Sequence, residues 1–128
     1  MFRQGDTFWI PSPENGIEHL YIVVSDLDKD CRKIVVVPLT TRESWTDETC
    51  TFHAGSHPAI KHDTCVDYRR AKILTAEALN CALSKRQIRK GASPMPARML
   101  RDILDGANST RYLPKECDRV LHDQGLID

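Results

Sequence analysis

A dense group of histidine and basic side chains lies in the middle of the sequence. Within 18 residues the chain carries three histidines and three cations: His53, His57, Lys61, His62, Arg69 and Arg70. Imidazole accepts and donates protons near neutral pH, because its ordinary pKa is about 6.5. Lys and Arg bind anionic oxygens through charge-assisted hydrogen bonds. We therefore predict that the segment from His53 to Lys72 is the working surface, where proton transfer and phosphate binding can be combined.

A second basic run follows this segment. Between Ser84 and Arg101 the chain has six basic residues and no acidic one. Such a run binds backbone phosphates with little sequence preference and with strong salt dependence. The candidates for nucleic-acid binding are Lys85, Arg86, Arg89 and Lys90. A solvated linker explains the same residues equally well, and the sequence leaves both interpretations open.

Metal binding and thiol chemistry are less favoured by the spacing. Cys50, His53, His57 and His62 form a C-x2-H-x3-H-x4-H pattern that resembles a zinc set. No C-x-x-C pair accompanies it, so we predict no metal and no cofactor. Cys65 is close to His62 in sequence, but a cysteine on a strand is more often a buried apolar group than a nucleophile.

The composition is that of one folded domain. The chain has 128 residues, of which 41% are hydrophobic and 28% charged, as in ordinary globular proteins. We see no secretory signal, and the apolar stretches are too short to span a bilayer. Five cysteines are an odd number and lack paired spacing, which favours free thiols in a reducing cytosol. We expect a cytoplasmic protein with no membrane partner.

The charges are unevenly distributed, although their sum is zero. The balance is −4 for residues 1–60, +7 for residues 61–101 and −3 for residues 102–128. A basic middle between acidic ends can form a surface that faces phosphates. Solvated charges scattered around the fold are an equally good explanation at this stage.

The pattern of apolar residues predicts a mainly β fold through the first two-thirds of the chain. Six segments have β-branched, aromatic or alternating composition: Thr7–Ile10, His19–Ser25, Lys33–Thr41, Thr49–His53, Thr64–Val66 and Arg70–Leu74. His19–Ser25 is almost continuously apolar, so both of its faces should be covered. Pro38 lacks a backbone donor, so the strand that contains it should lie at an edge or bulge there. We predict a small β-barrel over residues 1–74.

The last third is expected to be helical. Thr75–Leu83 can form a short helix capped by Thr75. Pro94 and Pro96 precede a stronger helix, whose apolar face is formed by Leu100, Ile103, Leu104 and Ala107. Gly106 is its expected stop, and Pro114 begins a last helix. Residues 75–128 are thus a helical extension packed on the barrel, and residues 1–128 form a single domain.

The order of these segments resembles the PemK/MazF-like toxins, a family of SH3-like β-barrels with appended helices. The matching residues are Gly5–Ile10 (GDTFWI), Ile22–Ser25 (IVVS) and Val37–Thr41 (VPLTT). Arg70–Ile73 can correspond to the family's late strand, and Lys90-Gly91 precedes its C-terminal helix. The resemblance covers roughly residues 3–107. It implies a metal-independent endoribonuclease of a toxin–antitoxin pair, with RNA, an antitoxin protein and a second copy in a homodimer as partners.

The resemblance also points to two site positions. Thr40 matches a threonine whose hydroxyl lies in the family's active site. His19 stands where the family usually has an arginine that stabilises the scissile phosphate. Our hypothesis is that His19 and His62 are the acid and base, Lys61 and Arg69 stabilise the phosphate, and Thr40 binds it.

Several of these residues also have a purely structural explanation. His57-Pro58 can shape a turn, and the Asp63 carboxylate can accept a local backbone hydrogen bond. Arg69 and Arg70, if they lie on a strand, must point to opposite faces. The alternative function is a non-catalytic SH3-like barrel that binds a protein or nucleic acid, because such folds serve many tasks. Catalysis is favoured if His19, Thr40 and the His57–His62 loop share one groove.

Overall fold

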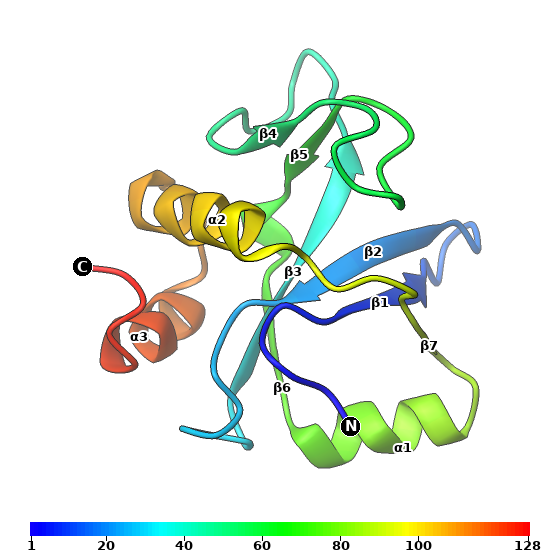
Figure 1. Cartoon of the computed structure of the whole chain (residues 1–128), viewed down its shortest axis with the longest axis vertical. Helices are drawn as coiled ribbons and strands as arrows, with labels where there is room; N and C mark the ends of the chain where they lie inside the picture. Colours follow the sequence, from blue (N-terminus) through cyan, green and yellow to red (C-terminus); the bar gives the residue numbers. More distant parts are fainter.

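A seven-stranded antiparallel sheet forms the centre of the molecule, and three α-helices pack around it (Figure 1). The computed structural model describes all residues from 1 to 128. The strands are β1 (Thr7–Pro11), β2 (Glu18–Val23), β3 (Ile34–Thr41), β4 (Thr51–Phe52), β5 (Thr64–Val66), β6 (Lys72–Leu74) and β7 (Arg89–Lys90). The helices are α1 (Ala76–Ser84), α2 (Ala97–Ser109) and α3 (Lys115–Asp123), and a short 3-10 helix, η1, spans Tyr68–Arg70.

The sheet is open, which corrects part of the predicted fold class. Its order is β4-β5-β3-β2-β1-β7, and β6 pairs with the first half of β3. The two end strands, β4 and β7, do not pair with each other, so no closed barrel forms. Helical and strand residues are about equally numerous, so the fold is mixed α/β rather than mainly β.

The alternation of side chains along the central strands produces two hydrophobic cores. On β2 and β3, Ile22 and Val37 belong to the larger core, which α2 and α3 cover. Their neighbours Val23 and Val36 belong to the smaller core, to which α1 contributes Leu79. Both faces of β2 are therefore buried, as its continuous apolar sequence predicted. Figure 1 shows α2 and α3 together on one side and α1 apart from them.

Pro38 is placed in the centre of the sheet and not at an edge. It lies in β3 opposite Tyr21 of β2, which contradicts the edge prediction. On its other side β3 pairs first with β6 and then with β5, and Pro38 lies between these two pairings. The Pro38 carbonyl accepts a hydrogen bond from Asp67 N (2.9 Å) in the connection between them. The missing donor costs little because no ladder hydrogen bond is required in this gap.

The three predicted helices are present. The Thr75 hydroxyl caps α1 by accepting from Ala78 N (3.0 Å). The predicted face of α2 packs inward, with Ile103 and Ala107 buried. The predicted stop at Gly106 is wrong, because α2 continues to Ser109. Gly106 is instead a contact position, since a Cβ there would lie 2.1 Å from the Tyr68 hydroxyl oxygen.

The region after residue 74 is not purely helical. Strand β7 belongs to it and pairs with β1, so this region also completes the sheet. Both hydrophobic cores contain residues from before and after residue 75. None of the three helices combines the length and apolar character that crossing a bilayer requires.

Candidate functional site

Four of the five predicted catalytic residues line one surface hollow of about 260 Å³. These four are His19, Thr40, Lys61 and His62. Apolar side chains also line it, and Ile60 is among them. We call this cavity the His19 hollow. Arg69 is not among its lining residues.

Strand pairing explains why His19 and Thr40 come together. Strands β2 and β3 are antiparallel, and Tyr21 pairs with Pro38. When this register is extended by two residues, His19 comes opposite Thr40 at the ends of both strands. Thr40 is further held by its pairing with Cys65 of β5. Two residues that are 21 positions apart in the sequence therefore meet at one end of the sheet.

The loop between β4 and β5 brings Lys61 and His62 to the same place. At its base the Asp63 carboxylate accepts a hydrogen bond from Ala54 N (3.1 Å), nine positions earlier, so Asp63 has a structural role, although its partner is not a local one. Gly55 N donates to Ile60 O (2.8 Å), which closes the loop on itself. Ile60 is 3% exposed and anchors the loop in the larger core. Lys61 and His62, which follow it, are exposed at the hollow.

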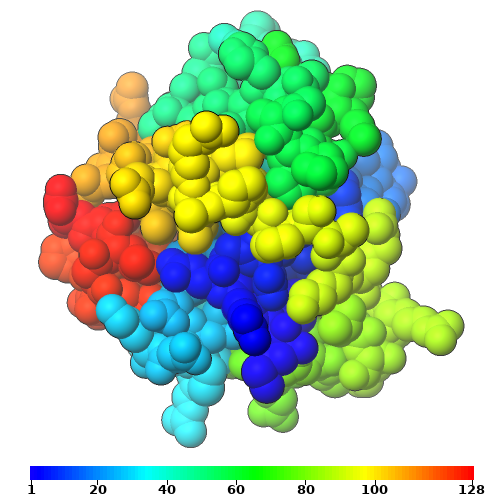
Figure 2. All heavy atoms as spheres, viewed as in Figure 1, coloured from blue at the N-terminus to red at the C-terminus, as the bar shows by residue number.

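His57 is a structural residue of this loop. Its side chain is buried, and its Nδ1 accepts a hydrogen bond from Ala59 N (3.0 Å). Nε2 lies 3.1 Å from Pro94 O, so it is the protonated nitrogen and donates to that carbonyl. Figure 2 shows this green loop against the yellow segment that precedes α2. The turn interpretation of His57-Pro58 is thus the correct one.

Replacing His57 by alanine should disturb the loop and the hollow together. We expect His57→Ala to lower the free energy of unfolding by about 2 kcal/mol, because the buried imidazole is removed and its half-buried hydrogen bonds with Pro94 O and Ala59 N are lost. Chemical denaturation measures this loss. His53→Ala is the matched control, since the His53 side chain is 90% exposed. An equal effect of the two substitutions would contradict the anchoring role.

The zinc-like pattern does not converge in space. No group of three or more His, Cys, Asp or Glu side chains is placed to hold a metal ion. Cys50 lies in the larger core, and both ring nitrogens of His57 contact the protein itself. The four residues of the pattern are therefore separated by the packing of the loop.

The buried thiols are poor nucleophiles. Burial raises the pKa of Cys50 to about 11 and that of Cys117 to about 11. Burial also raises the pKa of the Cys65 thiol, which is fully buried beside Thr40. All five cysteines are free. Because the thiolate is the reactive form, these buried groups do not favour thiol catalysis near neutral pH.

Arg69 occupies a neighbouring hollow of about 320 Å³. It lies on η1 and not on a strand, so the condition for Arg69 and Arg70 to point to opposite faces of a sheet is not met. The Arg69 guanidinium lies 4.5 Å from the ring centroid of Tyr112, and Arg70 forms an ion pair with Asp67 (3.5 Å). Thr40 lines both hollows and connects them.

The second basic run divides into two pairs. Arg89 and Lys90 form β7, where Arg89 binds the Glu18 carboxylate through two nitrogens (2.8 and 3.0 Å) and lies 5.0 Å from the Trp9 ring centroid. This contact lowers the pKa of Glu18, first through the hydrogen bond from Arg89. Lys90 lies 3.5 Å from the Asp6 carboxylate. Lys85 and Arg86 are exposed and take part in none of the chain's ion pairs.

Two aromatic residues line the hollow that contains Arg69, and neither of them was selected from the sequence as a site residue. Trp45 is 80% exposed in the loop after β3, and Tyr112 is 38% exposed in the connection between α2 and α3. A tryptophan within a polar loop is itself a signal, because large apolar side chains usually avoid solvent. Tyr112 carries no comparable signal, since only the fold brings it beside Arg69.

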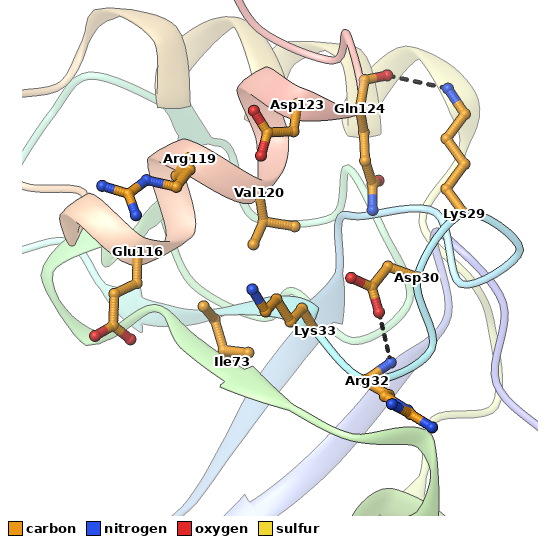
Figure 3. A pocket seen from close by; sticks show the side chains of 10 residues that line it. All are labelled: Lys29, Asp30, Arg32, Lys33, Ile73, Glu116, Arg119, Val120, Asp123 and Gln124. Carbon is orange, nitrogen blue, oxygen red and sulfur yellow. Dashed lines mark hydrogen bonds between the residues drawn. The ribbon is translucent and has the colours of Figure 1, made fainter.

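A third hollow, larger than the two described above, lies elsewhere (Figure 3). It measures about 660 Å³ between α3 and the start of β3, and its lining includes Lys33, Glu116 and Arg119. Thr40 is at the other end of β3, roughly 20 Å away at 3.3 Å per residue. Seven charged side chains line this hollow, while the chain's five ion pairs all lie outside it. None of the predicted site residues reaches it.

A comparison of the chain with models of known protein families and with curated proteins found no match. The site therefore has to be interpreted from its own residues.

Proposed function

We propose that the protein is a PemK/MazF-like toxin that cleaves RNA without a metal ion. The observation that carries this proposal is the shared hollow of His19, Thr40, Lys61 and His62. The proposal takes the open sheet as a form of the family's SH3-like barrel. It also takes the histidine at position 19 as a replacement for the family's arginine, with a new role in proton transfer.

The chemistry needs a base, an acid and cations. One imidazole, of His19 or His62, takes the proton from the ribose 2′-hydroxyl as its oxygen attacks phosphorus. The other imidazole gives a proton to the departing 5′-oxygen as the P–O bond breaks. The products are a 2′,3′-cyclic phosphate and a 5′-hydroxyl, and no metal is needed. Lys61 and the Thr40 hydroxyl stabilise the charge that develops on the phosphoryl oxygens.

The role proposed for Arg69 differs from the phosphate stabilisation that was expected from the sequence. It lies in the neighbouring hollow, so in this proposal it contacts the RNA beside the cleaved phosphate rather than the phosphate itself. Thr40 lines both hollows, so a bound RNA strand can extend from one hollow into the other.

The proposed partners follow from the family. RNA is the substrate, a second copy forms a homodimer, and an antitoxin protein covers the groove in a cytoplasmic setting. The gene neighbourhood offers an inexpensive check, because an antitoxin reading frame is expected just upstream.

Cleavage of a mixed RNA pool tests the proposal directly. Purified wild-type protein should cut RNA in the presence of a chelator and leave cyclic phosphate ends, which end-labelling reveals. Absence of cleavage by the clean wild-type protein, both as prepared and after removal of any bound antitoxin, would contradict the proposal.

The two halves of the basic run should differ in their effect on RNA binding. We expect Lys85→Ala and Arg86→Ala each to reduce the slope of log affinity against log salt by about one phosphate contact. Lys90→Ala should change the slope less, because Asp6 already neutralises that ammonium. Fluorescence anisotropy with an uncleavable 2′-O-methyl RNA measures the slopes. Equal slopes for all variants and the wild type would support the linker interpretation instead.

The alternative function is a binding module without catalysis. The hollow in Figure 3 favours it, because its seven charged side chains are free of ion pairs with one another and can meet a charged partner. Four of these side chains are cations and three are carboxylates, so an anionic partner is expected. Reversing Lys33 and Arg119 to glutamate should weaken binding of that partner, and this function predicts no RNA cleavage by the wild-type protein.

A further inference from the structure

The hollow that contains Arg69 has the side chains of a stacking site. Trp45, Tyr112, Arg69 and Arg70 line it, together with Thr40. We call it the Trp45 hollow. Its volume of about 320 Å³ is at the lower end of the range for small-molecule sites, which suits one nucleotide.

The exposed aromatic rings are the first argument. The Trp45 ring is 80% exposed, and no aromatic or cation–π partner covers it. Tyr112 has guanidinium groups close by, with Arg69 at 4.5 Å and Arg111 at 5.8 Å from its ring centroid. Aromatic rings and guanidinium planes are the groups on which proteins stack unpaired bases.

The loop that carries Trp45 is tied to the segment that carries Tyr112. The Asp47 carboxylate accepts hydrogen bonds from Thr110 Oγ1 (2.8 Å) and from Thr49 N (2.9 Å). Burial raises the pKa of Asp47, but the hydrogen bonds from Thr49 and Thr110 and the charge of Arg69 more than offset this, so the pKa is below its usual value. The ionised carboxylate therefore holds the two aromatic segments together before any ligand arrives.

The balance of charges in the Trp45 hollow favours a neutral base over a polyphosphate as its ligand. Two arginines, Arg69 and Arg70, face two carboxylates, Asp47 and Asp67, in the same hollow. Arg70 is already paired with Asp67 (3.5 Å). A site for several phosphates would need an excess of cations, whereas a neutral base needs π surfaces and hydrogen-bonding groups.

We infer that the Trp45 hollow binds the base of the nucleotide next to the cleaved phosphate in single-stranded RNA. We assign the base to the nucleotide next to the cleaved phosphate because Thr40 lines both this hollow and the His19 hollow, so the two hollows are adjacent. The inference rests on the proposed function for the identity of the cleaved bond, but binding of single-stranded RNA at Trp45 does not depend on cleavage. Duplex RNA should not bind in the Trp45 hollow, because its bases are already stacked and paired with one another.

Binding to an uncleavable RNA tests the inference apart from catalysis. The probe is a pool of short, labelled 2′-O-methyl oligoribonucleotides, which lack the attacking hydroxyl. We expect it to quench tryptophan emission of the wild-type protein and to bind Trp45→Ala and Tyr112→Ala about tenfold more weakly or worse. Trp45→Phe and Tyr112→Phe are the matched controls. They should keep the affinity within about twofold, and Trp45→Phe should also lose the part of the quench that comes from Trp45, leaving only that of Trp9 in the His19 hollow.

The outcomes separate the two proposals. Binding that depends on Trp45 in a protein that cuts no RNA supports the stacking site and contradicts the nuclease. Cleavage and binding that are the same in Trp45→Ala, Tyr112→Ala and the wild type overturn the stacking site and leave the nuclease standing. Tight binding of the corresponding duplex would also overturn it. Circular dichroism of each variant confirms that the fold is intact.

Discussion

Substituting alanine for His19 or for His62 should each reduce the rate of RNA cleavage by about 100-fold or more. Both residues line the His19 hollow, and they are the only two imidazoles there. Removing either one removes the acid or the base, and water replaces it poorly. The measurement is the single-turnover rate with a labelled RNA and a chelator present. The double variant should be little worse than either single one, because the two groups act in one step.

His53 supplies the control for this prediction. It belongs to the same loop region as His62, but its side chain is 90% exposed and it does not line the hollow. His53→Ala should therefore cut RNA at a rate close to that of the wild type. If all three variants remain active, the hollow is not the catalytic site. If His53→Ala is as impaired as the others, the effect is one of loop structure.

Replacing Gly106 by alanine should destabilise the protein by about 3 kcal/mol. In an ordinary helix interior this change stabilises by roughly 0.5–1 kcal/mol, so the expected sign is reversed. The reason is the contact with Tyr68. A Cβ on Gly106 would lie 2.1 Å from the Tyr68 hydroxyl oxygen and 3.0 Å from Cys50 Cβ. That hydroxyl also donates to Ile103 O (2.7 Å) in the buried core, and the clash would break the bond.

A double-variant cycle identifies the clash as the cause. In a Tyr68→Phe background the oxygen is absent, so Gly106→Ala should cost about 1 kcal/mol less than it does in the wild type. Denaturation midpoints for the four proteins give the coupling energy. A stabilising effect of Gly106→Ala, or equal effects in both backgrounds, would show that Tyr68 and Gly106 are not in close contact.

The sequence predicted most of the secondary structure correctly, because each signal was local. The Thr75 cap, the proline before α3 and the apolar face of α2 all act within one or two turns of a helix. The continuous apolar run from Leu20 to the end of β2 predicted burial on both faces, and the two cores confirm it. The prediction of a stop at Gly106 and the edge alternative for Pro38 failed for a different reason. Their neighbours, Asp67 and Tyr68, are distant in the sequence.

The candidate site illustrates the same division. Residue types and a family resemblance were sufficient to select His19, Thr40, Lys61 and His62, and all four line one hollow. They were not sufficient to show that Arg69 lies outside this hollow. Its position depends on η1, which interrupts the sheet between β5 and β6. Nor could they show that Glu18 already binds Arg89 across 71 positions of the chain.

Composition and short-range pattern were thus enough for the helices, the strands and the double burial of the sheet, and together with the family resemblance they gave a short set of candidate site residues. Only the tertiary structure decided which of those residues meet, which cations are already neutralised, and that the sheet stays open. The physical reason is that helix caps and apolar periodicity act over a few residues. Strand register, loop closure and ion pairing instead join distant segments, and many arrangements share the same local pattern. The His19 hollow exists because β2, β3 and the loop before β5 end at the same corner of the sheet.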